Sequence, residues 1–452
     1  VFVRVIPEPV LRLSSLDLGT TKDVTELTDL FNFGNDYMSL VKAGVIASGL
    51  IPPSFEGTGQ SIASILANVV APGMGIELVT KVNDIPKGSR LAVSTNLLAG
   101  IVSVLMRATG QTQSLEGGLR EEERRLVASR AILGEWLGGS GGGWQDSGGV
   151  WPGIKIIEGA RAVEGDTEYG ISRGCLLPKH HVLATHDLHP EITERLSQSL
   201  VLLHGGMAQN VGPILEMVTE KYLMRAADEW RARHHMRAIF DGILTALKRG
   251  DVRSLAAHTT QNWDGPLKTI IPWVTNHFTE AIIARAKEAF GSAYWGFQML
   301  GGMSGGGMAM YVDPAQREAF REQILRIMRE AKQGLEDSLP FAMDPVVYNF
   351  AINPRGTWAT LLTDDDALMP SRYYALQVPE LVRQSPESIS YLRRAELDHF
   401  TAQGKEPTEM FGLLRTIVSN LFRVAGSATR SGRIEWDREA ERITAENGFD
   451  AV

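Results

Sequence analysis

The sequence predicts an α+β fold of two domains followed by a helical extension. Short strand-like runs mix with helical patterns up to about residue 198, which is typical of an α/β domain. Between 199 and 345 a long helical stretch precedes a glycine-rich loop flanked by strands, which indicates a second α+β domain. The segment 346–452 has helical patterns of its own. With 452 residues, 44% apolar and 22% charged, the chain is long enough for two cores and an extension.

In the first domain, β-branched and apolar runs predict strands at 1–6 and 75–82, and an apolar helix is expected over 95–107. The run "REEERR" at 120–125 opens a helix expected to continue to Leu137, because its acidic residues lie at the positive end of the helix dipole. Strands are expected around 150–163 and at 199–204.

In the second domain, three helical stretches lead to strands on either side of "GGMSGGGMAMYV" at 301–312, and a charged helix is expected over 314–337. In the extension, 407–426 carries apolar residues on one helical side. This face is expected to pack on the body of the protein or on a partner, which is consistent with a homo-oligomer.

Charge and composition narrow the class of partner. The formal net charge is -8 and basic residues form only short clusters, so nucleic acid is not expected as a partner. A small-molecule partner is expected instead. Cys175 is the single cysteine, which excludes an internal disulfide and a Cys-pair zinc site. The apolar run 97–106 is too short for a membrane span and no secretory leader is recognised, so a cytoplasmic protein is expected. The sequence opens with "VFVRVIPEP", which is a strand pattern without an initiator Met. An upstream part of the protein that this sequence does not include is therefore expected.

Three glycine-containing loops are the candidate functional features: "PKGSRLAVST" at 86–95, "GSGGGWQDSGG" at 139–149 and the 301–312 loop. None contains the dinucleotide pattern G-x-G-x-x-G or the P-loop pattern G-x-x-x-x-G-K-[ST]. The first runs into a helix, where backbone N–H groups and the helix dipole suit a triphosphate.

The arrangement resembles the GHMP family of small-molecule kinases, most closely its fucokinase branch. The string "GGGWQD" at 141–146, a glycine pair at 148–149 and "PGIK" at 152–155 carry the resemblance. It extends over about 1–345 through "LRLSSLDLG" at 11–19 and "MLGGMSGGGMAMYV" at 299–312, and "DPVVYNFAINPRGTWATLL" at 344–362 is similar to the end of fucokinase-like chains. The resemblance implies a two-domain GHMP-kinase fold with a ferredoxin-like second domain, and ATP- and Mg²⁺-dependent phosphorylation of the anomeric hydroxyl of fucose or a related hexose.

The resemblance also implies residue roles. Asp146 is the expected catalytic acid/base, and Glu135 and Ser94 are the expected metal ligands. The expected ATP-binding residues are Gly88, Ser89, Arg90, Ser94, Thr95, Gly141, Gly142 and Gly143. The expected substrate-binding residues are Trp144, Gln145, Gly302, Gly305, Gly306 and Gly307. These residue types suit phosphoryl transfer, which requires positioned oxygens, a divalent ion and a carboxylate near the attacking hydroxyl.

The sequence also departs from the family pattern. The phosphate loop of the family resembles G-L-G-[ST]-S, whereas residues 90–94 read "RLAVS". Ala92 thus replaces a glycine, and alanine adopts a positive φ only at a cost in free energy. Ser304 replaces a glycine, and "HGGMAQNV" at 204–211 lacks the family's Thr-Arg pair. A catalytically weakened binding or scaffold module is therefore the alternative. Structural roles also stay open for four of the candidate site residues. Asp146 could be a solvated aspartate in a turn, Ser94 and Thr95 could cap a helix, and Trp144 could anchor the glycine loop to the core. The histidines at 180–189 are expected in a surface loop.

Overall fold

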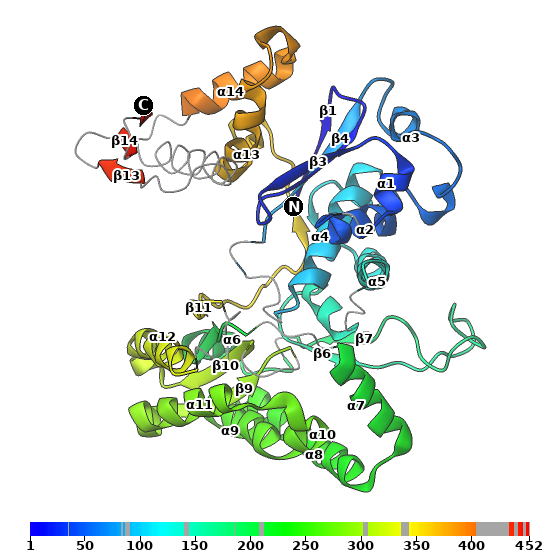
Figure 1. Cartoon of the computed structure of the whole chain (residues 1–452). Helices are drawn as coiled ribbons and strands as arrows, with labels where there is room; N and C mark the ends of the chain where they lie inside the picture. Colours follow the sequence, from blue (N-terminus) through cyan, green and yellow to red (C-terminus); the bar gives the residue numbers. More distant parts are fainter. Residues whose placement is uncertain are drawn as a thin grey trace.

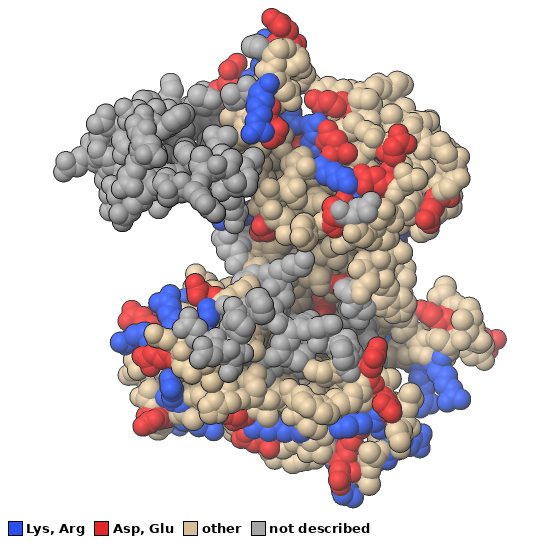
Figure 2. Space-filling view, viewed as in Figure 1, with Lys and Arg blue, Asp and Glu red and all other residues tan. Residues whose placement is uncertain are grey.

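The computed structural model describes residues 1–403, except 35, 83–84, 86–90, 140–143, 185, 208–211, 302–305 and 336–342, together with strands at 434–437, 442–445 and 449–451. Its helices and strands confirm the predicted α+β class. Two units, each built on a four-stranded sheet, meet at a narrow waist (Figures 1 and 2). None of the helices in the described part of the chain is long and apolar enough to cross a membrane.

The first unit has the strand order β1-β4-β2-β3, in which β2 and β4 are parallel and the other pairs antiparallel. Its strands are β1 (Phe2–Ile6), β2 (Leu11–Ser15), β3 (Thr20–Val24) and β4 (Gly75–Thr80). Its helices are α1 (Leu27–Phe31), α2 (Ser39–Ser48), α3 (Ile62–Val69), α4 (Val93–Ala108) and α5 (Glu121–Leu137). The helices expected at 95–107 and 120–137 are therefore present, as α4 and α5.

Strand alternation gives this sheet two different faces. Leu11, Leu13 and Leu78 share the main core with helix residues such as Ile101 and Leu105 of α4. The opposite face carries a row of charges, because Arg4 pairs with Glu77 across β1 and β4, and Glu77 is in register with Arg12. An apolar layer alone therefore could not cover that face.

The second unit has the strand order β11-β8-β10-β9. In chain order this is 4-1-3-2, the arrangement of the ferredoxin-like β-α-β-β-α-β motif, as predicted. The strands are β8 (Leu200–His204), β9 (Tyr294–Met299), β10 (Gly307–Val312) and β11 (Val346–Tyr348). The helices are α6 (Ile192–Ser199), α7 (Gly212–Met224), α8 (Ala227–Arg249), α9 (Val252–Asn262), α10 (Lys268–Ile270), α11 (His277–Phe290) and α12 (Arg317–Gln333).

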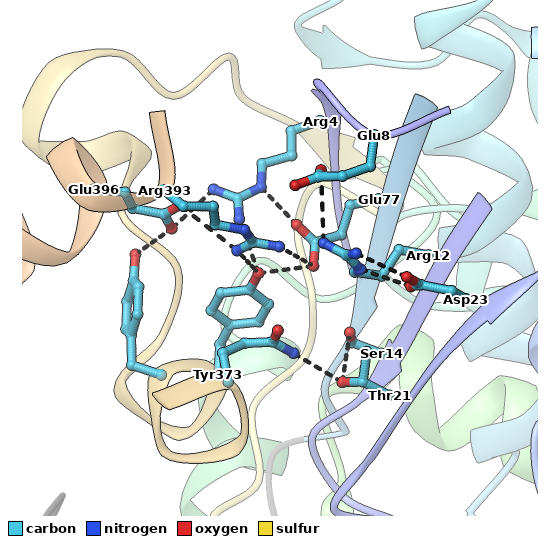
Figure 3. A network of polar contacts seen from close by, with 12 residues as sticks. Arg4, Glu8, Arg12, Ser14, Thr21, Asp23, Glu77, Tyr373, Arg393 and Glu396 are labelled. Atoms are coloured by element: carbon cyan, nitrogen blue, oxygen red, sulfur yellow. Dashed lines mark hydrogen bonds and ion pairs between the residues drawn. The ribbon is translucent and has the colours of Figure 1, made fainter. Parts of the chain in front are cut away.

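The C-terminal segment is not wholly helical. β11 completes the second sheet although it lies just beyond residue 345, and β12 (Trp358–Ala359) pairs with β5 (Gly117–Gly118) of the first unit. Helices α13 (Ser371–Val382) and α14 (Tyr391–Gln403) follow, and α13 packs on the charged face of the first sheet (Figures 1 and 3). A small antiparallel sheet contains β13 (Ile434–Asp437), β14 (Arg442–Ala445) and β15 (Phe449–Ala451). The helix predicted at 407–426 lies outside the described residues.

Candidate active site

Three elements of the first unit converge on the candidate site: the N-terminal turn of α4, the C-terminal turns of α5, and the 3-10 helix η2 (Trp144–Val150). A core cluster that includes Leu98 and Val102 of α4, Ala131 of α5, Val150 of η2 and the following Trp151 holds them together. The polar residues of all three elements are thus placed by buried apolar contacts.

Thr95 and Glu135 form a buried polar pair across two of these helices. The Thr95 hydroxyl donates to Glu135 Oε1 at 2.8 Å. Each residue is only 1% exposed. A carboxylate is buried in this way only where partners offset the loss of hydration. The contact brings together two predicted site residues that are 40 positions apart in the chain.

Asp146, in the first turn of η2, is partly buried beside this pair. Burial, followed by the negative charge of Glu135, raises the pKa of Asp146 to about 6. The Glu135 carboxylate is therefore close enough to raise the pKa of Asp146. Two acids in one partly buried site are suited to sharing a cation or to proton transfer.

The first turn of α4 has an unusual start. Ala92, its N-cap residue, has φ 56° and ψ 27°, in the left-handed region. No side chain caps the turn at this position, and such a helix end favours an anion. Ser94 is half-buried on the same turn. The remaining phosphate-loop residues, Gly88, Ser89 and Arg90, lie outside the described residues.

The other two glycine loops are described only in part. Trp144 begins η2 and Gln145 is exposed, whereas Gly141, Gly142 and Gly143 are outside the described residues. In the third loop Gly306 and Gly307 are buried at the start of β10, with Gly307 in register with His204 of β8. Gly302 and Gly305 fall outside the described part. Their substrate-binding roles stay predictions.

The histidine-rich segment differs from the predicted surface loop, because His180 and His181 lie in strand β7 (Lys179–Val182). The His180 ring stacks on Trp151, with ring centroids 3.6 Å apart and 9° between the planes, and its Nε2 lies 3.2 Å from Ser147 Oγ. No pattern in the sequence indicates this contact, since the stack joins residues 29 positions apart, on either side of the pairing between β6 (Lys155–Glu158) and β7. Within the described chain, no three His, Cys, Asp or Glu side chains gather in a metal-binding group.

The donor set at Glu135 fits magnesium better than a softer metal. Carboxylate and hydroxyl oxygens are hard ligands, and Mg²⁺ is usually held by one or two carboxylates together with substrate phosphates and water. Glu135 and the Thr95 hydroxyl, one residue from Ser94, supply oxygens of this kind at the anion-favouring end of α4. The residues present therefore fit an Mg²⁺–nucleotide complex.

Comparisons with known proteins give sequence relatives over most of the chain. The bifunctional fucokinase/GDP-fucose pyrophosphorylase of Arabidopsis thaliana is 26% identical over 326 residues, which is 70% of this chain and 25% of the relative. The L-fucokinase/L-fucose-1-P guanylyltransferase of Bacteroides fragilis is 26% identical over 337 residues, or 73% of this chain and 31% of the relative. The match thus spans less than a third of either relative. No family model matches the chain.

Among solved structures, the galactokinase of Lactococcus lactis complexed with galactose aligns with a TM-score of 0.48 and 13% identity, over 79% of this chain and 86% of that one. The L. major mevalonate kinase in complex with R-mevalonate aligns with a TM-score of 0.45 and 15% identity, over 78% and 86%. The names of these sequence relatives agree with the fucokinase resemblance predicted from the "GGGWQD" loop. The chain is therefore similar in sequence to these fucokinase-containing proteins over 70–73% of its length.

Proposed function

We propose that this chain is an ATP- and Mg²⁺-dependent sugar kinase that phosphorylates the anomeric hydroxyl of fucose or a related hexose. The observation that carries the proposal is the buried Thr95–Glu135 pair beside Asp146, a carboxylate with a raised pKa, in a loop like that of fucokinases. The fucokinase names of the two sequence relatives support the choice of sugar.

In this proposal Asp146 orients the sugar hydroxyl and accepts its proton. A pKa of about 6 leaves the carboxylate deprotonated at neutral pH and basic enough to take part. A bond forms between the sugar oxygen and the γ-phosphorus, while the bond from that phosphorus to the β,γ-bridging oxygen breaks and releases ADP.

The remaining residues bind and place the nucleotide. Glu135 and the hydroxyl of Thr95 or Ser94 hold the metal, and the N-terminal turn of α4 receives the phosphates. Bound Mg²⁺ would neutralise the charge of the β- and γ-phosphates. The apolar packing of α4 against α5 fixes these oxygens before any ligand binds, which reduces the entropy lost on reaching the reactive geometry.

The test is a panel of hexoses assayed for ADP release, with the sugar phosphate identified by mass spectrometry. Fucose or a relative is expected to raise ADP release above the background ATPase, and Asp146→Asn to remove about a factor of 100 or more from kcat. Asp166→Asn, in the segment between β6 and β7, is the control and should leave the rate unchanged. Sugar-independent ATPase with every hexose would refute the kinase assignment.

A catalytically weakened binding module is the second candidate, favoured by the strained Ala92 at the start of α4. Calorimetry with the non-hydrolysable analogue AMPPNP and Mg²⁺ separates the two. Binding that is lost in Glu135→Gln, together with sugar-dependent turnover, supports the kinase. Binding of the same kind without turnover on any sugar supports the module.

A further inference from the structure

The hairpin of β6 (Lys155–Glu158) and β7 packs directly against the η2 turn that carries Asp146. The approach is close at Gly148, where a Cβ atom would lie 2.6 Å from Ile157 Cδ1. No residue of this hairpin was a predicted site residue. The hairpin nevertheless contacts Ser147, the residue that follows the candidate catalytic Asp146.

His180 of β7 makes the polar part of this contact. Its Nε2 lies 3.2 Å from the hydroxyl oxygen of Ser147, a residue that is 0% exposed. The face of its ring lies on Trp151, which is itself fixed because its indole N–H donates to Glu121 Oε2 at 2.8 Å. A path of contacts therefore runs from α5 through two aromatic rings to the residue that follows Asp146.

The His180 ring is neutral at neutral pH. Burial, with smaller contributions from the positive charges of Arg125, Lys155 and His181, lowers the pKa of His180 to about 4. The ring therefore stacks on Trp151 and meets Ser147 without a charge that would need its own solvation or counter-ion.

We propose that His180 is a positioning residue for Asp146. By holding the Ser147 hydroxyl, it fixes the η2 turn so that the Asp146 carboxylate stays beside Glu135. A displacement of about 1 Å in such a group is enough to cost about 100-fold in rate. The kinetic part of this inference depends on the proposed kinase activity, whereas the structural part, the restraint of η2, does not.

Two substitutions separate the roles of the ring. His180→Phe keeps an aromatic face for Trp151 but removes the ring nitrogen that meets the Ser147 hydroxyl, and His180→Gln keeps a polar group for that hydroxyl. We expect His180→Phe to lower kcat about tenfold with the KM for ATP within about twofold, and His180→Gln to retain most of the rate. Ser147→Ala should match His180→Phe, and the double variant should be no worse than either single variant.

The matched control is His181→Gln on the same strand, where the side chain is 53% exposed and lies 3.5 Å from Glu158. It should leave kcat unchanged. Amide hydrogen exchange of residues 144–150, followed by mass spectrometry, gives a readout that needs no turnover. Exchange should be faster in His180→Phe and equal to wild type in His180→Gln and His181→Gln.

Wild-type exchange and wild-type kcat in His180→Phe would overturn the inference. Equal losses in His180→Phe and His180→Gln would also overturn it, because then the hydrogen bond to Ser147 is not what matters. If the wild-type chain phosphorylates no sugar, the proposed function fails, and the exchange rates alone decide whether His180 restrains η2.

Discussion

The backbone strain at Ala92 could be predicted from the sequence. The letters placed an alanine where the family has a glycine, and the structure gives that alanine a φ of 56°. An L-residue pays about 1–2 kcal/mol for this conformation, which exceeds the extra chain entropy of glycine, about 0.5–1 kcal/mol. We therefore expect Ala92→Gly to raise the free energy of unfolding by about 0.5–1 kcal/mol, measured by urea denaturation.

The control is Ala108→Gly at the other end of α4, an exposed helical position. There the same substitution should lower the free energy of unfolding by about 0.5–1 kcal/mol, because glycine weakens a helix. The two changes thus have opposite expected signs. Equal destabilisation at both positions would mean that the backbone at Ala92 is not strained.

Thr95, rather than Ser94, is the hydroxyl that the structure pairs with Glu135. Thr95→Val keeps the shape and removes the donor, leaving a buried carboxylate oxygen without this hydrogen bond. We expect a loss of about 1–3 kcal/mol in stability, and weaker Mg²⁺–AMPPNP binding in calorimetry. Ser94→Ala, on the half-buried neighbour, should cost less than about 1 kcal/mol. If Ser94→Ala instead weakened Mg²⁺–AMPPNP binding more than Thr95→Val does, Ser94 would be the metal ligand.

Asp146 also predicts a pH dependence for the chain without nucleotide or metal. Its pKa is raised from 3.8 to about 6, so between these values the folded chain binds more protons than the unfolded chain. Stability contributed by this group therefore falls as the pH rises from about 4 to about 6. Asp146→Asn should unfold at the wild-type temperature at pH 4 and at a higher temperature than wild type at pH 7.5. Identical melting temperatures at both pH values would contradict the raised pKa.

At the scale of elements, the site depends on how closely η2 approaches α4. A Cβ on Gly149 would lie 1.8 Å from the Asn96 side-chain oxygen, so even alanine must displace the Asn96 side chain, which donates to the Ala92 carbonyl at 2.8 Å. We expect Gly149→Ala to destabilise the chain by about 1–3 kcal/mol and to lower kinase activity. Gly159→Ala, where a Cβ meets nothing within 4 Å, should change neither by a measurable amount.

The same elements show what could be predicted from sequence. Helix α4 was predictable because it has a long apolar run, and α5 because it begins with three acidic residues in its first turn. The ferredoxin-like order followed from the family resemblance. The His180–Trp151 stack was not predictable, because β7 is short and largely exposed and its alternation carries no core signal. Short-range patterns indicate elements, but not which side chains meet between them.

At the scale of the whole molecule, the C-terminal helices are joined to the first sheet through a buried network of charges (Figure 3). The Tyr373 hydroxyl donates to Glu77 Oε1 at 2.7 Å and accepts from Arg4 Nη2 at 2.9 Å and from Arg393 Nη1 at 2.5 Å. Glu396 of α14 binds Arg4 as well, at 2.9 Å. Residues as far as 392 positions apart thus complete one network, a contact that no local pattern in the sequence could indicate.

Glu77 is the centre of this network, because it is 0% exposed and lies 2.8 Å from Arg4 Nε and 3.8 Å from Arg393 Nη2. Glu77→Gln leaves two guanidinium groups facing a neutral amide in a buried place, and removal of one partner of a buried ion pair costs about 3–5 kcal/mol. We expect a loss close to the lower figure, because Arg4 keeps Glu396. We also expect faster proteolytic cleavage between β12 and α13, as the helices detach from the sheet.

Glu380→Gln in α13 is the matched control, since its pair with Arg383 is exposed and should contribute less than about 1 kcal/mol. Tyr373→Phe should reproduce part of the Glu77→Gln effect, because it removes the hydroxyl that joins α13 to the sheet. If Glu77→Gln unfolds at the wild-type urea concentration and is cleaved no faster, the network does not hold the helices. The apolar contacts of Met369, Tyr374 and Val79 would then be what attaches the extension to the first unit.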